Sequence, residues 1–339
     1  MLDDFLLREI DLGTFPSVSY AAGTVDGGIA IQRALGRAVS VPLRLDATTD
    51  TIYDCASITK PLITTTLVLQ AIAEKKIALD DEYRGYTFRE LLSHTTGLRP
   101  WLPLYAIGSD YLRIIEERGV EAPRGSRVAY SDLNFILLYY ALGEIFGDFL
   151  TAARQRVIDR LQLRDTMFNP PASLRPRIAA TEWGQRFERG FAARVGVPWV
   201  QAREGLMWGE VNDGNSFNAG GTCGNAGLFS TARDVFAIAA AFARGELVAP
   251  ELVAEATRNQ TEGLNERRGL GWLLGGPGLS ESSYGHSGFT GTSIWVDGER
   301  VFVFMTNRVH PCAAPVAIQH ARKKFHELAG SIVQPHSRA

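Results

Sequence analysis

The sequence predicts an α+β fold in which both ends of the chain build one antiparallel sheet, flanked by helices, around an inserted and mainly helical subdomain. Three observations lead to this expectation. Strand patterns lie near both ends of the 339 residues, the middle reads as helices and polar loops, and tight-turn signals join neighbouring strands. We expect an α/β subdomain of residues 1–60 and 226–339, a helical and loop-rich subdomain of residues 61–225, and any active site at their junction.

The first expected elements are two strands, 17–23 and 29–32, joined by the glycine-containing turn 26–28. A helix follows over about 57–75, because its apolar side chains recur at helical spacing. Pro61 fixes where this helix begins. Proline is tolerated only in the first turn of a helix, where the N–H groups have no partner.

The middle of the chain favours helices. Thr87 is expected to cap a short helix that Gly97 ends. The strongest amphipathic pattern predicts a helix over 132–145. The stretch 165–229 is long and irregular, and such a segment in a compact protein usually lines a site.

The last third returns to strands. Ser230 or Thr231 is expected to cap a helix that runs through Ala243. The turn signal at 297–298 joins the final two strands in a hairpin. The elements expected after that helix are strands at 269–274, 292–296 and 301–306, and a helix at 314–328.

Composition excludes several classes of protein. The charges nearly cancel, at −2, and no basic stripe indicates a nucleic-acid partner. The longest apolar runs, such as 235–243, are too short for a membrane span. Cys55, Cys223 and Cys312 show no disulfide or metal spacing, so we expect reduced thiols. The acidic N-terminus lacks a secretory pattern, which favours a cytoplasmic protein.

The sharpest chemical signal is Ser57 followed three residues later by Lys60. Only five lysines occur in the chain, at 60, 75, 76, 323 and 324, and only Lys60 follows a serine by three. The i, i+3 spacing puts both side chains on one helix face, at the positive end of the helix dipole. A nearby ammonium and that dipole both favour a serine alkoxide. A chance match is the alternative, because so short a pattern also arises at random.

Two further segments carry candidate chemistry. Tyr130-Ser131-Asp132 precedes the strongest helix, so Ser131 or Asp132 is expected to be its N-cap. Under the functional interpretation, Tyr130 projects from the turn before the helix and Asp132 points into a cleft, and both interpretations can hold together. Residues 285–291 hold three glycines around His286, which allows a ligand to approach the strand backbone closely. A bulged strand with a half-exposed histidine is the alternative there.

In order and separation, these three motifs resemble the serine β-lactamase and penicillin-binding-protein superfamily, in its class C β-lactamase-like and esterase branch. That family carries S-x-x-K, then Y-x-N, then K-T-G or H-[ST]-G. The resemblance covers about residues 16–330 and implies a β-lactamase/transpeptidase-like fold. Further matching stretches are residues 91–98, 163–167, 225–231 and 288–292.

The resemblance implies a role for each matching residue. Ser57 matches the nucleophile that becomes acylated, and Lys60 matches the lysine that holds the serine and tyrosine hydroxyls. Tyr130 matches the residue that carries the serine proton to the leaving group. The backbone N–H groups of Ser57 and Phe289 match the oxyanion hole. The implied substrate-binding residues are Asp132, His286, Ser287, Gly288, Asn212 and Asn215, although the segment 212–215 also reads as a plain turn.

Two positions depart from the family pattern. The Y-x-N asparagine is Asp132, and a carboxylate cannot donate a hydrogen bond as an amide does. The K-T-G lysine is His286, so a fixed cation becomes a group that ordinarily titrates near pH 6.5. Both changes weaken the case for a penicillin-type substrate.

We therefore expect a cytoplasmic serine hydrolase that cleaves small esters or amides through an acyl-Ser57 intermediate. The alternatives are a β-lactamase or D-Ala-D-Ala peptidase, and a non-catalytic relative that only binds a ligand. The partner is a small-molecule ester, amide or lactam, with no nucleic acid and no membrane, and the oligomeric state is open. No metal or nucleotide motif appears in the sequence, so we expect no cofactor.

Overall fold

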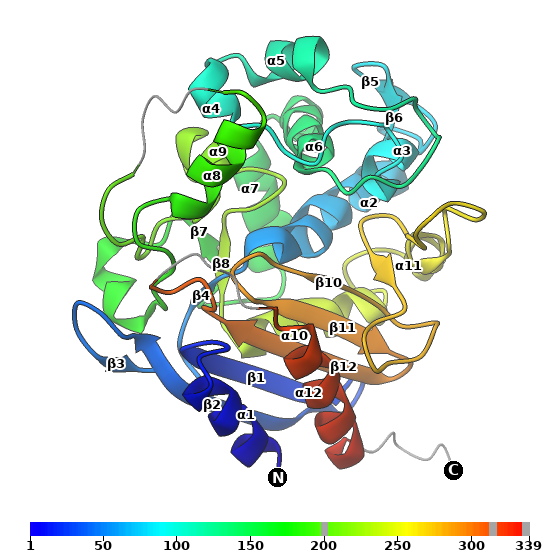
Figure 1. The fold of residues 1–339 in the computed structure, drawn as a ribbon. Helices are drawn as coiled ribbons and strands as arrows, with labels where there is room; N and C mark the ends of the chain where they lie inside the picture. The colour runs from blue at the N-terminus through cyan, green and yellow to red at the C-terminus, as the bar shows by residue number, and fades with distance from the viewer. Residues whose placement is uncertain (198–202, 312–316, 334–339) are drawn as a thin grey trace, which may run out of the picture.

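The computed structural model describes residues 1–197, 203–311 and 317–333, and it confirms the α+β expectation (Figure 1). Its main sheet is antiparallel, with the strand order β3-β2-β1-β12-β11-β10-β9. The strands are β1 (Ser17–Thr24), β2 (Gly28–Val39), β3 (Leu45–Asp46), β9 (Leu273–Leu274), β10 (Tyr284–Ser287), β11 (Ser293–Asp297) and β12 (Arg300–Thr306).

The two ends of the chain meet at the centre of this sheet. Strand β1 pairs with β12 along its length, with Val18 opposite Thr306 and Thr24 opposite Arg300. The other edge of β1 pairs with β2, which runs well past the expected 29–32. The central pairing therefore joins residues nearly 300 positions apart in sequence. The helical middle of the chain lies between these strands in sequence and above the sheet in space.

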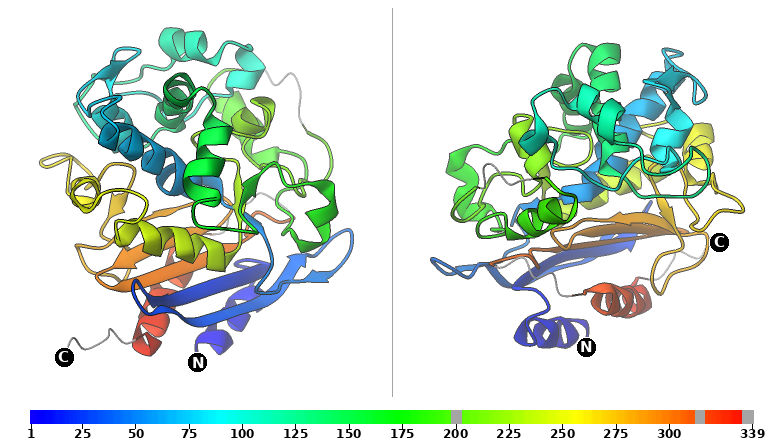
Figure 2. Two further views of the ribbon diagram at one scale, coloured as in Figure 1. Left: turned by 180° about the vertical axis from the view of Figure 1, so that it is seen from behind. Right: turned by 45° about the horizontal axis from the view of Figure 1, so that its top comes forward.

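The two faces of the sheet are covered by different layers. Helices α1 (Leu2–Asp11) and α12 (Gln319–Ile332) lie on one face (Figure 2). There the Tyr20 and Phe304 rings pack against Phe325, with centroids 5.5 and 5.0 Å away. Helix α10 (Ala232–Ala243) packs on the opposite face, where the alternate strand residues point. The sequence did not lead us to expect α1.

The remaining elements form the helical body above the sheet and its connections. The helices are α2 (Thr66–Ala73), α3 (Phe88–Ser93), α4 (Leu104–Ile107), α5 (Tyr111–Arg118), α6 (Asp132–Phe146), α7 (Phe149–Ala153), α8 (Arg186–Arg194), α9 (Gly214–Asn218) and α11 (Pro250–Thr257). Two small sheets are made by β4 (Tyr53–Asp54), β8 (Leu228–Ser230) and β7 (Met167–Phe168), and by β5 (Glu82–Tyr83) and β6 (Tyr86–Thr87).

The helix expected over 57–75 exists but is not uniform. It begins as a 3₁₀ turn (Ala56–Ile58), widens into a π-helical turn (Lys60–Thr65) and continues as α2. Pro61 lies in the first positions of the widened turn, as its missing N–H requires. The segment from 56 to 73 is long and apolar enough to cross a membrane, but 83% of it is buried inside the fold. It is a core helix.

Several local expectations are confirmed. Thr87 caps α3 in a reciprocal capping box with Glu90, and Thr231 caps α10. Helix α6 covers the predicted 132–145. The thiols of Cys55 and Cys223 are free and buried, whereas Cys312 lies outside the described residues.

Three expectations about element ends are wrong. Helix α3 ends before Gly97, because His94 takes the left-handed conformation (φ 59°) directly after Ser93. The strand expected at 269–274 is reduced to β9. Gly271 has φ +75° there, and a Cβ on it would lie 1.9 Å from Thr65 Oγ1, so the chain turns from the sheet to pack on the core helix. The helix expected at 314–328 begins at Gln319 and runs to Ile332, and residues 314–316 lie outside the described ranges.

Asp54 anchors the chain directly before Ser57. Its buried carboxylate accepts hydrogen bonds from the backbone N–H groups of Ala56 (2.8 Å) and Asn212 (2.7 Å). Ala56 has φ 46°, a conformation that is costly for a residue other than glycine. Burial raises the pKa of Asp54 to about 6. Asp54 therefore stabilises a strained turn and ties it to a loop more than 150 residues away.

Asp54→Asn is expected to destabilise the protein by about 1–3 kcal/mol, because an amide nitrogen would face one of two N–H donors and leave it unpaired. Urea unfolding at pH 8, where the carboxylate is ionised, measures this difference. The matched control is Asp50→Asn, whose carboxylate is exposed and pairs with Arg233, and which should stay within about 0.5 kcal/mol of wild type. Equal effects of the two substitutions would contradict the anchoring role.

Candidate active site

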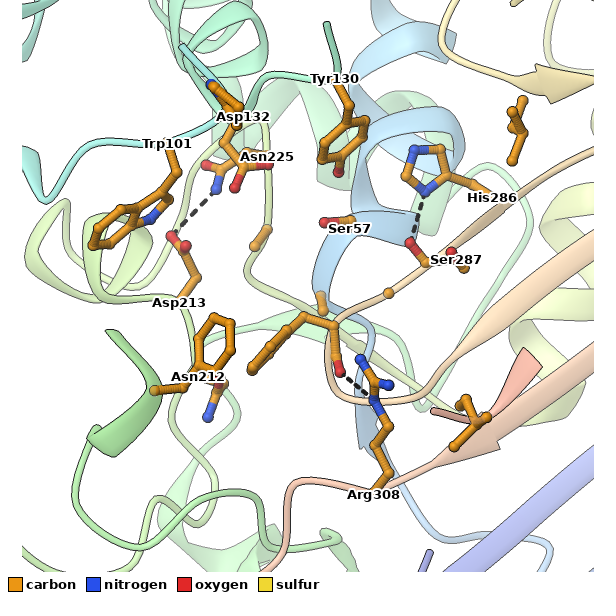
Figure 3. A pocket seen from close by; sticks show the side chains of 18 of the residues that line it. Ser57, Trp101, Tyr130, Asp132, Asn212, Asp213, Asn225, His286, Ser287 and Arg308 are labelled. Atoms are coloured by element: carbon orange, nitrogen blue, oxygen red, sulfur yellow. Dashed lines mark hydrogen bonds between the residues drawn. The ribbon is translucent and has the colours of Figure 1, made fainter. Parts of the chain in front are cut away.

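A cavity of about 690 Å³ lies between the end of β10 and the helical body, within the size range of small-molecule sites. Figure 3 shows Tyr130, His286 and Ser287 on one side of Ser57, and Trp101, Asn212 and Asp213 on the other. All the candidate site residues from the sequence line this cavity except Lys60, which lies beneath Ser57, and Asn215. Within the described ranges, no group of three His, Cys, Asp or Glu side chains is placed to hold a metal ion.

Ser57 and Lys60 meet as their spacing predicts. Lys60 Nζ lies 3.0 Å from Ser57 Oγ and donates a second hydrogen bond, also 3.0 Å, to the backbone carbonyl of Asn225. The Lys60 side chain is completely buried. The two side chains sit where the 3₁₀ turn passes into the π-helical turn, so the local change in helix type sets their geometry.

Asp132 turns toward Lys60. Its Oδ1 lies 2.6 Å from Lys60 Nζ, and its side chain is 18% exposed at the cavity. The backbone N–H of Asp132 donates to the carbonyl of Pro100, which fixes the start of α6. Asp132 was expected to contact a substrate, and the structure shows that its closest charged contact is Lys60.

Tyr130 lies over the Lys60 ammonium, whose Nζ is 5.0 Å from the ring centroid. His94 positions this segment, since its Nδ1 accepts a hydrogen bond from the Ser131 N–H and its ring lies 4.7 Å from that of Tyr130. Burial raises the pKa of Tyr130, and the charge of Lys60 together with a hydrogen bond from Ser57 opposes that rise. Tyr130 therefore lies beside both the Lys60 ammonium and the Ser57 hydroxyl.

The surroundings of His286 disfavour its charged form. Its side chain is 4% exposed, and its Nδ1 lies 2.9 Å from the carbonyl of Ser287 (Figure 3). Burial, and then the charges of Lys60 and Arg268, hold the pKa of His286 well below the usual histidine range. The expectation that His286 titrates near pH 6.5 is therefore wrong: the sequence shows the residue type but not its burial beside two cations.

The turn after β10 is held against the chain before Ser57. Thr290 Oγ1 donates to the carbonyl of Asp54 (2.8 Å), and Thr292 Oγ1 donates to that of Cys55 (2.9 Å). A Cβ on Gly288 would lie 2.2 Å from Thr292 Oγ1, so only glycine allows this close approach. These contacts bring Phe289 to the same cavity as Ser57.

The two asparagines of the 212–215 segment have different positions. Asn212 lines the cavity. Asn215 is completely buried away from it, with Oδ1 accepting from the N–H of Leu104 and Nδ2 donating to the carbonyl of Leu102. The expectation that Asn215 binds substrate is wrong, because both ends of its amide hold the backbone before α4.

Sequence reasoning missed an aromatic wall and a cation. The rings of Phe187 and Phe289 lie 4.6 Å apart, those of Trp101 and Phe191 lie 5.4 Å apart, and all four residues line the cavity. On the other side, the Arg268 guanidinium stacks over the Tyr130 ring at 5.4 Å. Phe187 and Phe191 lie one turn apart on α8, but Trp101, Arg268 and Phe289 come from other parts of the chain, so no single local pattern marks the group.

Comparisons with known proteins identify the family of this chain. Residues 11–324 match the family model described as Beta-lactamase. A putative D-alanyl-D-alanine carboxypeptidase of Salmonella enteritidis PT4 is 28% identical over 372 aligned positions, which cover 93% of this chain and 84% of that protein.

Solved structures share the β-lactamase/transpeptidase-like fold. EstCE1, described as a hydrolase with promiscuous acyltransferase activity, superposes with a TM-score of 0.73 at 18% identity, covering 97% of each chain. The octameric penicillin-binding protein homologue of Pyrococcus abyssi gives a TM-score of 0.73 at 18% identity, covering 98% of this chain and 76% of that one. Simvastatin synthase (LovD) of Aspergillus terreus gives 0.71 at 16% identity, covering 100% and 98%.

Proposed function

The chain belongs to the beta-lactamase family, and we propose that it works as a serine hydrolase that cleaves small esters and amides through an acyl group carried on Ser57. The observation that carries this proposal is the 3.0 Å contact between Ser57 Oγ and the fully buried Lys60 ammonium, at the floor of the cavity. A buried cation beside a hydroxyl favours its ionised form, which is the nucleophile.

The proposed acyl transfer assigns a group to each step. Ser57 Oγ attacks the carbonyl carbon while its proton passes to the Lys60–Tyr130 pair. The backbone N–H groups of Ser57 and Phe289 receive the oxyanion, whose charge appears only in the tetrahedral state. Tyr130 then delivers the proton to the leaving group, and water repeats the sequence on the acyl-enzyme.

The cavity favours apolar acyl groups. The aromatic wall, which consists of Trp101, Phe187, Phe191 and Phe289, lines the same cavity as Ser57, and its Trp101 lies across Ser57 from Tyr130 (Figure 3). If Tyr130 protonates the leaving group, the acyl group must extend toward this wall. Burying apolar area there lowers the free energy of binding by about 25 cal/mol per Å².

Lactam chemistry is less well matched. His286 supplies no standing positive charge for a lactam carboxylate, and Asp132 offers no amide donor. A β-lactamase or D-Ala-D-Ala peptidase remains the second candidate, because relatives are named putative D-alanyl-D-alanine carboxypeptidases and Arg268 places a cation near Tyr130. A non-catalytic relative is the third, and covalent labelling distinguishes it from both enzymes.

Mass spectrometry after treatment with a fluorophosphonate or a slow ester should find one covalent adduct, on the peptide that contains Ser57. The reason is that Ser57 is the one serine, among the residues that the structure describes, whose hydroxyl contacts the buried ammonium. Ser57→Ala should abolish both labelling and turnover, and Ser93→Ala serves as the control because Ser93 pairs with Thr95 in the core. An adduct on Ser287, with Ser57→Ala still active, would reject the assignment, and no adduct at all would favour a ligand-binding relative.

Lys60→Ala and Tyr130→Phe should each lower kcat by about 10²–10⁴-fold, the usual contribution of general acid–base groups. Because the two side chains share the transfer of one proton, the double variant should lose far less than the product of the single losses. Steady-state kinetics on one nitrophenyl ester, with the fold checked by circular dichroism, measures this. Multiplicative losses would show that the two residues act independently.

Nitrophenyl esters should be better substrates than nitrocefin by kcat/KM, and aromatic or branched acyl groups should be better than acetyl. Phe187→Ala should lower kcat/KM for the bulky acyl esters by about 10-fold, as expected for losing part of a hydrophobic pocket. The acetyl ester, which is too short to reach this ring, is the internal control. Faster turnover of lactams than of esters by the wild type would replace the esterase proposal with the second candidate.

A further inference from the structure

Asp132 is the one carboxylate in contact with Lys60 among the described residues that line the cavity. The 2.6 Å contact joins two opposite charges, and the lysine end of the pair is completely excluded from water. The family pattern places an amide at this position, which carries no charge. The substitution therefore changes the electrostatics of the catalytic group rather than only the shape of the cavity.

The effect of this pair on proton affinity has a definite sign. Burial alone favours the neutral amine of Lys60, but the charges of Asp132 and Tyr130 outweigh it and raise the pKa of Lys60. Asp132 also acts on Tyr130, whose pKa its negative charge raises. An anion makes any neighbouring proton harder to remove, so Asp132 stabilises the protonated form of the whole Lys60–Tyr130 pair, whichever of the two groups loses the proton.

Other groups around the pair do not provide the same effect. The rings of His94 and His286 face Lys60 and Tyr130, and burial, followed by nearby cations, keeps the pKa of both well below the usual histidine range. Burial raises the pKa of the Cys223 thiol to about 12, so it stays neutral. Among the described residues, two charged groups act directly on members of the pair or on Asp132. Arg268 stacks on Tyr130 and opposes Asp132, and Asp213 acts on Asp132.

Given the serine-hydrolase function proposed above, we propose that Asp132 is a positioning residue that sets the working pH of the enzyme, by holding the proton on the Lys60–Tyr130 pair until the solution is alkaline. The bond between Ser57 Oγ and the carbonyl carbon forms as the serine proton moves to the deprotonated pair. That same proton leaves with the alcohol or amine when the old carbon–oxygen or carbon–nitrogen bond breaks. The pair must first lose one proton to solvent, and Asp132 opposes that loss.

The test is the pH dependence of kcat/KM for a nitrophenyl ester, from pH 5 to 10, for the wild type and three variants. The acid limb is the part of the profile where kcat/KM falls as the pH falls. Asp132→Asn removes the charge and keeps the shape of the side chain, so the midpoint of the acid limb should shift to lower pH by at least about one unit. At a pH well below the wild-type midpoint, kcat/KM of this variant, expressed as a fraction of its own alkaline plateau, should be about 10-fold higher than that of the wild type. Asp132→Glu keeps the charge and should keep the acid limb alkaline.

Asp213→Asn is the matched control, since it removes a carboxylate from the same cavity whose hydrogen bonds come from the Ser216 N–H and the Asn225 amide. Its acid limb should move much less than that of Asp132→Asn. Unchanged or upward-shifted limbs in Asp132→Asn would overturn the proposal, as would equal shifts in the two asparagine variants. Urea unfolding shows that each variant is folded. A wild type that forms no acyl-Ser57 at any pH would reject the proposed function itself, whereas normal acylation with an unmoved limb would reject only the role of Asp132.

Discussion

A lysine charge without access to water has to be paired, and this requirement organises the site around Lys60. An isolated ammonium costs several kcal/mol to bury, so its three donors must find acceptors in fixed directions. Here they are directed at a serine hydroxyl, a backbone carbonyl and a carboxylate. These contacts offset the cost of burying the Lys60 charge. They also fix the positions of Ser57, the cavity wall at Asn225 and the start of α6 relative to one another.

The sheet supplies the rigid frame that makes such directions reproducible. Strand β10 ends at the cavity. The Thr290 and Thr292 hydroxyls hydrogen-bond the turn after it to the backbone directly before Ser57. The Asp54 carboxylate adds a hydrogen bond from the backbone N–H of Asn212, on the opposite wall of the cavity. Each connection ends on a backbone group, so the relative position of the walls depends little on flexible side chains.

The sequence was informative where chemistry is local and uninformative where it depends on distant neighbours. The spacing of Ser57 and Lys60, the Pro61 constraint and the Thr231 cap involve residues within one turn, and the structure has each of them. The pairing of Asp132 with Lys60 and the neutral state of His286 depend on burial, which no short pattern encodes. Asn215 shows the opposite error. The sequence predicted a substrate contact, but its buried amide instead hydrogen-bonds the backbone at Leu104.

The pairing of β1 with β12 has a consequence for how the enzyme folds. The hydrogen bonds that complete the cavity join residues more than 230 positions apart, and contacts of such long sequence separation slow folding. During synthesis, the segment with Ser57 emerges long before the turn that carries Phe289. The nascent chain therefore holds Ser57 before the proposed oxyanion site exists, and we expect reactivity to arise only when the last strands close the sheet. Acylation is in this sense a property of the completed fold, and recovery of activity reports the final step of folding.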